Sequence, residues 1–151
     1  MRHARPALVG PDGTDHGRTL TEEGRRQADV VGRRLADLGW APDLVLASDA
    51  RRCRETWDGL APHVPAPARF LRELYYADPG GILDLLAREG GEAATVMLLG
   101  HNPAQGAIVA RLSGAGLFLR HAEAALLAGA GPSWRVAIAG RFRVVDMVSP
   151  G

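Results

Sequence analysis

The stretch TVMLLGHNP, residues 95–103, decides how this chain is expected to fold. Its first five residues, Thr95–Leu99, form a continuous apolar run, which is typical of a strand covered on both faces of a sheet. A glycine and a histidine follow directly. Asn102 and Pro103 then predict the start of a helix, with Asn102 as its cap and Pro103 in its first turn. A buried strand that passes almost directly into a helix is typical of a parallel α/β sheet.

The same alternation of apolar runs and helical patterns extends in both directions from this stretch. Before it, we expect a helix capped by Thr21 and ended by Gly39, and then a strand at Asp43–Ala47. A second helix follows, capped by Ser48 or Asp49, with Cys53, Trp57 and Leu60 on its core side; a surface connection at Ala61–Ala68 and a helix at about Pro79–Arg88 then lead to the strand Thr95–Leu99. After it, we expect a helix from Asn102 to Gly114 and strand-like runs at Ala124–Ala128, Val136–Ala139 and Phe142–Val148.

This order predicts an α/β fold: a three-layer sandwich with a mostly parallel central sheet and helices on both faces. We expect residues 1–151 to form one domain. In such folds, ligands bind beyond the carboxyl ends of the strands. Three polar segments occupy that position in the sequence, so we expect them to meet at one edge of the sheet: Met1–Pro6 (MRHARP), Ser48–Thr56 (SDARRCRET) and Leu98–Pro103 (LLGHNP).

Composition narrows the function classes. The formal net charge of +1 predicts no strong attraction to nucleic acid or membrane. All 18 basic residues are arginine, which excludes lysine chemistry such as a Schiff base. Cys53 is the only cysteine, so an intramolecular disulfide is impossible, and the histidine spacing predicts no metal site. No apolar run approaches the ~20 residues of a membrane span, and none is typical of a signal peptide. We therefore expect a cytoplasmic protein without a cofactor.

The chemistry expected at the sheet edge is phosphoryl transfer. Two histidines and several arginines, and no acids, are expected to converge there. Arginine guanidinium groups grip phosphate oxygens in bidentate fashion, and the helix that starts at Asn102 adds free backbone N–H groups. A neutral histidine nitrogen can attack phosphorus while arginines stabilise the equatorial oxygens.

At this point the sequence resembles the histidine phosphatase superfamily, named for an RHG tripeptide, and within it the small SixA-like phosphohistidine phosphatase branch. Four blocks carry the resemblance: Arg2-His3-Ala4 for RHG or RHA; Asp15, Arg18, Leu20, Thr21 and Gly24 for D-x-x-R-x-L-T-x-x-G; Ser48, Arg52 and Thr56 for S-P-x-x-R-A-x-Q-T; and Gly100, His101, Asn102 and Pro103 for G-H-N-P. Asp49 and Glu55 replace the usual Pro and Gln of the third block. Only Met1 precedes Arg2, so the strand that positions His3 is predicted to be short.

The resemblance implies a role for each matched residue. His3 would be the phospho-accepting nucleophile and His101 the second histidine. The phosphate ligands would be Arg2, Arg18, Arg52, His101 and Asn102. We expect Arg52 to face the site, and Arg51 and Arg54 to be exposed. His16, His63 and His121 are expected at the surface. The nearest candidate for a general acid is Glu73, with Asp78 behind it; the alternative for Glu73 is an ordinary surface residue.

These observations predict a metal-independent phosphatase that acts through a phosphohistidine intermediate on His3. The SixA-like branch implies phosphohistidine on a protein as the substrate. An imidazole leaving group also needs little proton donation near its pKa of ~6.5, which suits a site with an uncertain acid. Two alternatives stay open: a phosphatase for small phosphate monoesters, for which Glu73 would matter, and an inactive phosphate-binding or interaction module. The expected partners are a phosphorylated protein or a small phosphorylated metabolite, with no nucleic acid or membrane, and the chain is expected to be a monomer.

Overall fold

Three parallel strands form the centre of the computed structural model, which describes residues 1–151. Their order is β2–β1–β3, where β1 is Leu44–Ser48, β2 is Ala68–Leu71 and β3 is Val96–Leu99. Val45 of β1 is in register with Ala68 of β2 and Met97 of β3. Two further strands, β4 (Ala124–Ala128) and β5 (Arg143–Val148), form an antiparallel pair.

The N-terminal segment joins these two groups of strands. On one side, Gly100 N donates to Met1 O (3.1 Å) and His3 N donates to Gly100 O (3.0 Å), as in a parallel ladder. On the other side, Arg2 N donates to Glu123 O (3.0 Å) and Ala122 N donates to His3 O (3.0 Å). These backbone bonds hold His3 at the carboxyl end of the parallel strands, where ligands of α/β folds bind.

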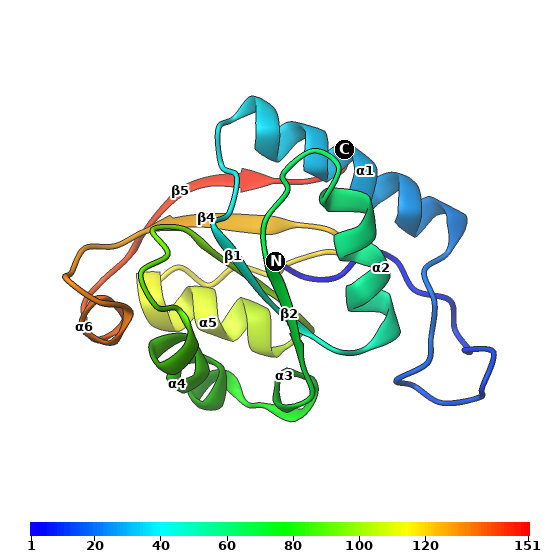
Figure 1. The fold of residues 1–151 in the computed structure, drawn as a ribbon, viewed down its shortest axis with the longest axis horizontal. Coiled ribbons are helices and arrows are strands. Elements are labelled where there is room, and N and C mark those ends of the chain that lie inside the picture. The colour runs from blue at the N-terminus through cyan, green and yellow to red at the C-terminus, as the bar shows by residue number, and fades with distance from the viewer.

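Helices cover both faces of the strands (Figure 1). On one face lie α1 (Glu22–Asp37) and α2 (Arg51–Leu60), and on the other lie α4 (Pro79–Glu89), α5 (Ala104–Ser113) and α6 (Trp134–Ala139), with the short α3 (Glu73–Tyr76) after β2.

Alternation along β1 shows why both faces need cover. Val45 and Ala47 belong to the core cluster with α1 and α2, whereas Leu46 belongs to the cluster with α4 and α5. All three side chains are fully buried. Burying a side chain such as Leu46 contributes about 1.5–3 kcal/mol. The predicted α/β sandwich with a largely parallel sheet is therefore confirmed.

Several predicted elements are confirmed where local signals govern them. Thr21 caps α1, and its side chain accepts a hydrogen bond from Gly24 N. Gly114 ends α5 in the left-handed conformation, with φ of 74°, which glycine adopts at little cost. Gly24 has a separate reason to be glycine. A Cβ atom there would lie 2.2 Å from Arg5 O, so this position holds α1 close to the segment that follows His3.

Other predictions of local structure were wrong. Two predicted helix caps failed because their side chains bond to distant residues. The N-cap of α2 is Ala50, without a side-chain cap, and the Ser48 hydroxyl contacts His101. The N-cap of α5 is Pro103, and the Asn102 amide donates to Leu119 O instead of capping. The run Val136–Ala139, predicted as strand-like, belongs to helix α6, which Ser133 caps. The elements β2 and α3 were not predicted at all.

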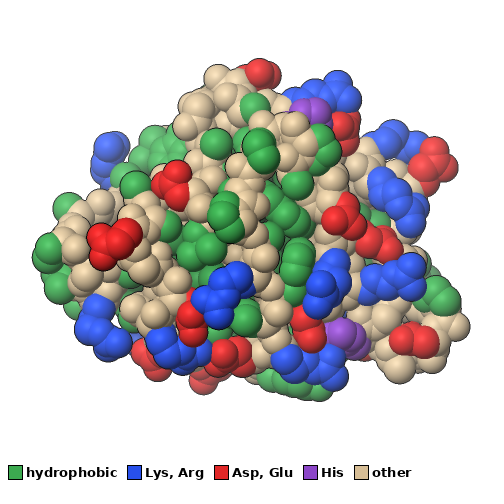
Figure 2. Space-filling view, viewed as in Figure 1, with side chains coloured by type: hydrophobic (Ala, Val, Ile, Leu, Met, Phe, Trp, Pro, Cys, Tyr) green, Lys and Arg blue, Asp and Glu red, His purple; other side chains and the backbone are tan.

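The surface carries charges of both signs, and one cavity lies apart from the candidate residues. Figure 2 shows basic and acidic side chains interspersed on one face of the molecule. An apolar cavity of about 490 Å³ lies between β3 and β4, but neither His3 nor Arg52 nor His101 lines it. None of the helices combines the length and the apolar character that crossing a membrane requires.

Candidate active site

The protonation of His3 follows from its backbone contact. His3 is 5% exposed, and its Nδ1 lies 2.8 Å from Ala4 O. A carbonyl oxygen only accepts, so Nδ1 carries the proton and Nε2 keeps its lone pair. Burial is the main cause that lowers the pKa of His3 far below its usual value, and the charge of Arg52 adds to it. His3 therefore presents a neutral ring whose Nε2 is unprotonated.

Arg52 is the centre of the polar contacts in the site. It comes from the first turn of α2 and is 6% exposed. Its Nε donates to Nε2 of His3 (3.3 Å), and its terminal nitrogens contact His101 Nδ1 (3.2 Å) and the backbone oxygen of Asp15 (2.8 Å). The Thr56 hydroxyl links α2 to the segment after His3, because it donates to Arg52 O and accepts from Ala4 N. The guanidinium group is thus fixed beside the lone pair of His3.

His101 follows β3 and lies against His3, with the two ring centroids 5.2 Å apart. Its Nδ1 accepts from Arg52, so its Nε2 carries the proton and donates to the Ser48 hydroxyl over 2.8 Å. Burial, and then the charge of Arg52, lowers the pKa of His101 to about 4. The ring is therefore neutral near pH 7. The two histidines and Arg52 form a compact group at the carboxyl ends of β1 and β3.

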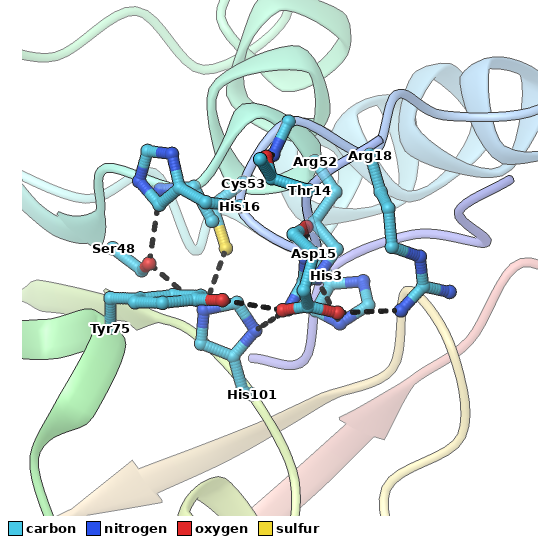
Figure 3. Close-up of polar contacts among 12 residues, drawn as sticks. His3, Thr14, Asp15, His16, Arg18, Ser48, Arg52, Cys53, Tyr75 and His101 are labelled. Carbon is cyan, nitrogen blue, oxygen red and sulfur yellow. Dashed lines mark hydrogen bonds and ion pairs between the residues drawn. The ribbon is translucent and has the colours of Figure 1, made fainter. Parts of the chain in front are cut away.

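An acid lies among these residues, contrary to the expectation that none would. Asp15 lies between Tyr75 on one side and Arg18 on the other (Figure 3). Its carboxylate accepts from the Tyr75 hydroxyl (2.5 Å), from Arg18 (3.0 Å) and from Arg52 (3.2 Å). The hydrogen bond from Tyr75, followed by the bonds from the arginines, holds the pKa of Asp15 well below its usual range. In this structure, a negative carboxylate therefore accepts hydrogen bonds from the guanidinium groups of Arg18 and Arg52.

Arg2 and Asn102 donate to the same backbone oxygen. Arg2 donates to Leu119 O over 3.1 Å, and the Asn102 amide donates to the same oxygen over 2.6 Å. One polar atom of each, Arg2 Nε and Asn102 Oδ1, is buried without a hydrogen-bond partner. A buried unpaired donor such as Arg2 Nε costs free energy unless a ligand satisfies it.

Other residues considered from the sequence lie outside this group. Glu73 begins α3, and its carboxylate pairs with Arg88 (2.8 Å) at 56% exposure, with no contact to the histidines. Asp78 caps α4 through Gly81 N. Arg51 and Arg54 are exposed, and His63 pairs with Asp29. The structure thus places no carboxylic acid from α3 or α4 beside His3.

Three residues near the site were not found by sequence reasoning in that role. Asp15 belongs to a matched motif, but no contact with Arg52 was expected from it. Tyr75 lies on α3, which was not predicted. His121 was expected at the surface, but its ring centroid lies 5.6 Å from that of His3. No local pattern marks Tyr75 or His121, because each reaches the site only through the packing of distant segments.

No group of three or more His, Cys, Asp or Glu side chains is arranged to hold a metal ion. The charge in direct contact with both histidines is the guanidinium group of Arg52. A neutral nucleophile beside fixed guanidinium donors is suited to an anionic electrophile such as a phosphoryl group.

Comparison with known proteins also indicates phosphoryl chemistry. A model of the histidine phosphatase superfamily (branch 1) matches residues 1–82. An uncharacterized chloroplastic protein of Arabidopsis thaliana is 32% identical over 165 aligned residues, which cover 99% of this chain and 76% of that protein. The structure of a putative phosphohistidine phosphatase SixA from Agrobacterium tumefaciens is 28% identical, with a TM-score of 0.83, and covers 99% of this chain and 95% of that one. A second such structure, from Nakamurella multipartitia, is 28% identical with a TM-score of 0.85 and covers 97% and 91%.

Proposed function

The chain belongs to the histidine phosphatase superfamily (branch 1), and we propose that it is a metal-independent phosphatase that carries the phosphoryl group on His3. The observation that carries this proposal is the contact between Arg52 Nε and the lone pair of His3 Nε2 at 3.3 Å. That contact places a positive charge beside the attacking nitrogen. The hydrogen bond breaks when Nε2 bonds to phosphorus, and the freed Arg52 donor can then bind a phosphoryl oxygen.

In the first step, Nε2 of His3 attacks phosphorus, and the bond from phosphorus to the leaving group breaks. The neutral state of His3 supports this role, because its Nδ1 proton is held by Ala4 O and no deprotonation is needed. Arg2, Arg18, Arg52, His101 and Asn102 hold the phosphoryl oxygens in this proposal. In the second step, water attacks the phosphohistidine and releases phosphate.

Entry of the phosphoryl group requires rearrangement around Asp15. Its carboxylate occupies donors of Arg18 and Arg52 that the phosphoryl oxygens would use. Asp15 is 55% exposed, so it can turn toward solvent at small cost when a dianion takes over the arginines. The Nδ1 atom of His101 must likewise acquire a proton or change tautomer to donate to a phosphoryl oxygen.

The preferred substrate in this proposal is phosphohistidine on a protein. Glu73 is engaged with Arg88, so no carboxylic acid contacts the histidines as a proton donor for an alkoxide. An imidazole leaving group departs near neutral pH with little such help. The similarity to the structures of two putative phosphohistidine phosphatases SixA supports the same substrate.

The test compares phosphate release from a protein that carries phosphohistidine and from an alkyl phosphate ester, with EDTA present throughout. We expect the native chain to hydrolyse the phosphohistidine much faster than the ester, and His3→Gln to hydrolyse neither. His63→Gln is a matched control, since His63 contacts Asp29 of α1 and none of the site residues. Faster release from the ester would favour a small-molecule phosphatase. Oxyanion binding without turnover of either substrate would favour a binding module.

A further inference from the structure

We propose that His121 is a third catalytic histidine, which acts as the general base for the water that hydrolyses the phosphoryl group on His3. This inference rests on the proposed function, because it requires a phosphorylated His3. It gives the second chemical step a residue that neither the matched motifs nor Glu73 supply.

The position of His121 is the first support. Its ring centroid lies 5.6 Å from that of His3, and the two ring planes are tilted by 40°. Each ring nitrogen lies at the edge of its ring, nearer to the space between the two rings than the centroid is. At this separation, a nitrogen of His121 can reach a water molecule beside a phosphoryl group on His3 through a single hydrogen bond. His101 lies at a comparable 5.2 Å from His3, but its Nε2 is engaged with Ser48.

The backbone around His121 is held in place against strain. Ala122 is the only residue other than glycine with a positive φ, at 62°, a conformation that costs free energy for a residue with a side chain. Its N–H donates to His3 O over 3.0 Å. The buried carboxylate of Glu123 closes the turn by accepting from Arg120 N over 2.7 Å. Such strain persists where surrounding contacts fix a functional geometry, and here the contact that fixes it is with His3 itself.

The surroundings of His121 favour a neutral ring with access to water. Burial, and then the charges of Arg2, Arg5 and Arg18, lower its pKa, whereas Glu23 acts in the opposite direction. A neutral imidazole near pH 7 can accept a proton. Beside it lies a hollow of about 280 Å³ with no hydrophobic lining, bordered by Arg2, Arg5, Gln27, Arg120, His121, Glu123, Pro150 and Gly151. This hydrophilic hollow gives water access to His121.

The oxygen of water forms a bond to phosphorus, and the bond from phosphorus to Nε2 of His3 breaks. The electron pair of that bond returns to Nε2, so His3 becomes neutral again. One proton of the water passes to the free nitrogen of His121, and phosphate leaves. His121 then releases the proton to solvent.

The test separates formation of the intermediate from its breakdown. Native chain, His121→Gln and the control His63→Gln are each mixed with a protein that carries phosphohistidine, quenched in alkali, and measured for phosphoryl on His3. We expect His121→Gln to form the intermediate at the native rate and to hydrolyse it about 100-fold more slowly, so that phosphorylated His3 accumulates. His63→Gln should behave as the native chain does.

A second variant guards against a merely structural effect. His121→Ala should also accumulate phosphorylated His3, and added imidazole should restore its hydrolysis, because a small base can enter the vacated space. Native turnover in His121→Gln, or slow formation of the intermediate without accumulation, would overturn the role of His121. Absence of phosphorylated His3 from the native chain and from both variants, despite phosphate release, would instead overturn the proposed function.

Discussion

Arg52 Nε donates a hydrogen bond to Nε2 of His3 across 3.3 Å, and this contact joins residues 49 positions apart in the chain. The same guanidinium group reaches His101 and Asp15 through its terminal nitrogens. The lone pair that accepts this bond is the one that would attack phosphorus, so the bond must break when a phosphoryl group arrives. The planar fork of Arg52 then has a donor free for a phosphoryl oxygen.

Arg52→Lys should abolish most of the activity while the charge is kept. An ammonium group cannot reproduce three separate donors in one plane, so stabilisation of the transferring phosphoryl group is lost. We expect kcat to fall by about 100-fold or more. Steady-state kinetics measure this, with Arg54→Lys as the matched control, because Arg54 is an exposed arginine of the same helix. A similar kcat for Arg52→Lys and Arg54→Lys would show that only charge matters.

Asp15→Asn should strengthen the binding of oxyanions. The carboxylate competes for donors of Arg18 and Arg52, and the neutral amide competes less. Exposed ion pairs are worth up to about 1 kcal/mol, so the dissociation constant for tungstate should fall by about fivefold. Isothermal titration calorimetry checks this, with Asp58→Asn as a control for net charge. Equal or weaker tungstate binding by Asp15→Asn would mean that the carboxylate supports the anion site instead of occupying it.

Glu73→Gln should leave catalysis unchanged. Glu73 is 56% exposed and pairs with Arg88, so its loss should change kcat/KM by less than about twofold and stability by less than about 0.5 kcal/mol. Both a phosphohistidine protein and an alkyl phosphate should be assayed. A large loss confined to the alkyl phosphate would identify Glu73 as a proton donor and would favour the small-ester function.

Acid should destabilise the fold partly through the two site histidines. Burial is the main cause that lowers the pKa of His101 to about 4 and that of His3 further still. In the unfolded chain both titrate near ~6.5, so below that pH the unfolded state binds more protons and the free energy of unfolding decreases. For His101 this loss should extend from about pH 6.5 to about pH 4.

Urea unfolding across that pH range measures the effect. His101→Gln has no titrating ring at this position, so its free energy of unfolding should depend less steeply on pH than that of the native chain. Identical pH dependence in the two proteins would mean that His101 is not held neutral by its surroundings.

Local signals in the sequence predicted much of the fold. The cap at Thr21 and the left-handed Gly114 depend on neighbouring residues, and both are confirmed. The caps assigned to Ser48 and Asn102 failed because those side chains bond to His101 and Leu119 instead. Val136–Ala139 is a short apolar run, for which periodicity cannot separate strand from helix.

Local signals also predicted only part of the candidate site. His3, Arg52 and His101 lie near the carboxyl ends of parallel strands, and ligands of α/β folds bind at those ends, so the sequence predicted that they meet. Tyr75 and His121 lie on α3 and on the turn before β4, and their approach to Asp15 and His3 depends on packing that no local pattern encodes.

Locating the phosphoryl group during turnover tests the role of His3. The native chain is mixed with a phosphohistidine protein in the presence of EDTA, quenched in alkali within one turnover, digested, and examined by mass spectrometry. We expect a phosphoryl group on His3 that is stable to alkali, labile to acid and absent from His3→Gln. Phosphate release with no phosphorylated residue, or with the phosphoryl group on His101 alone, would contradict it.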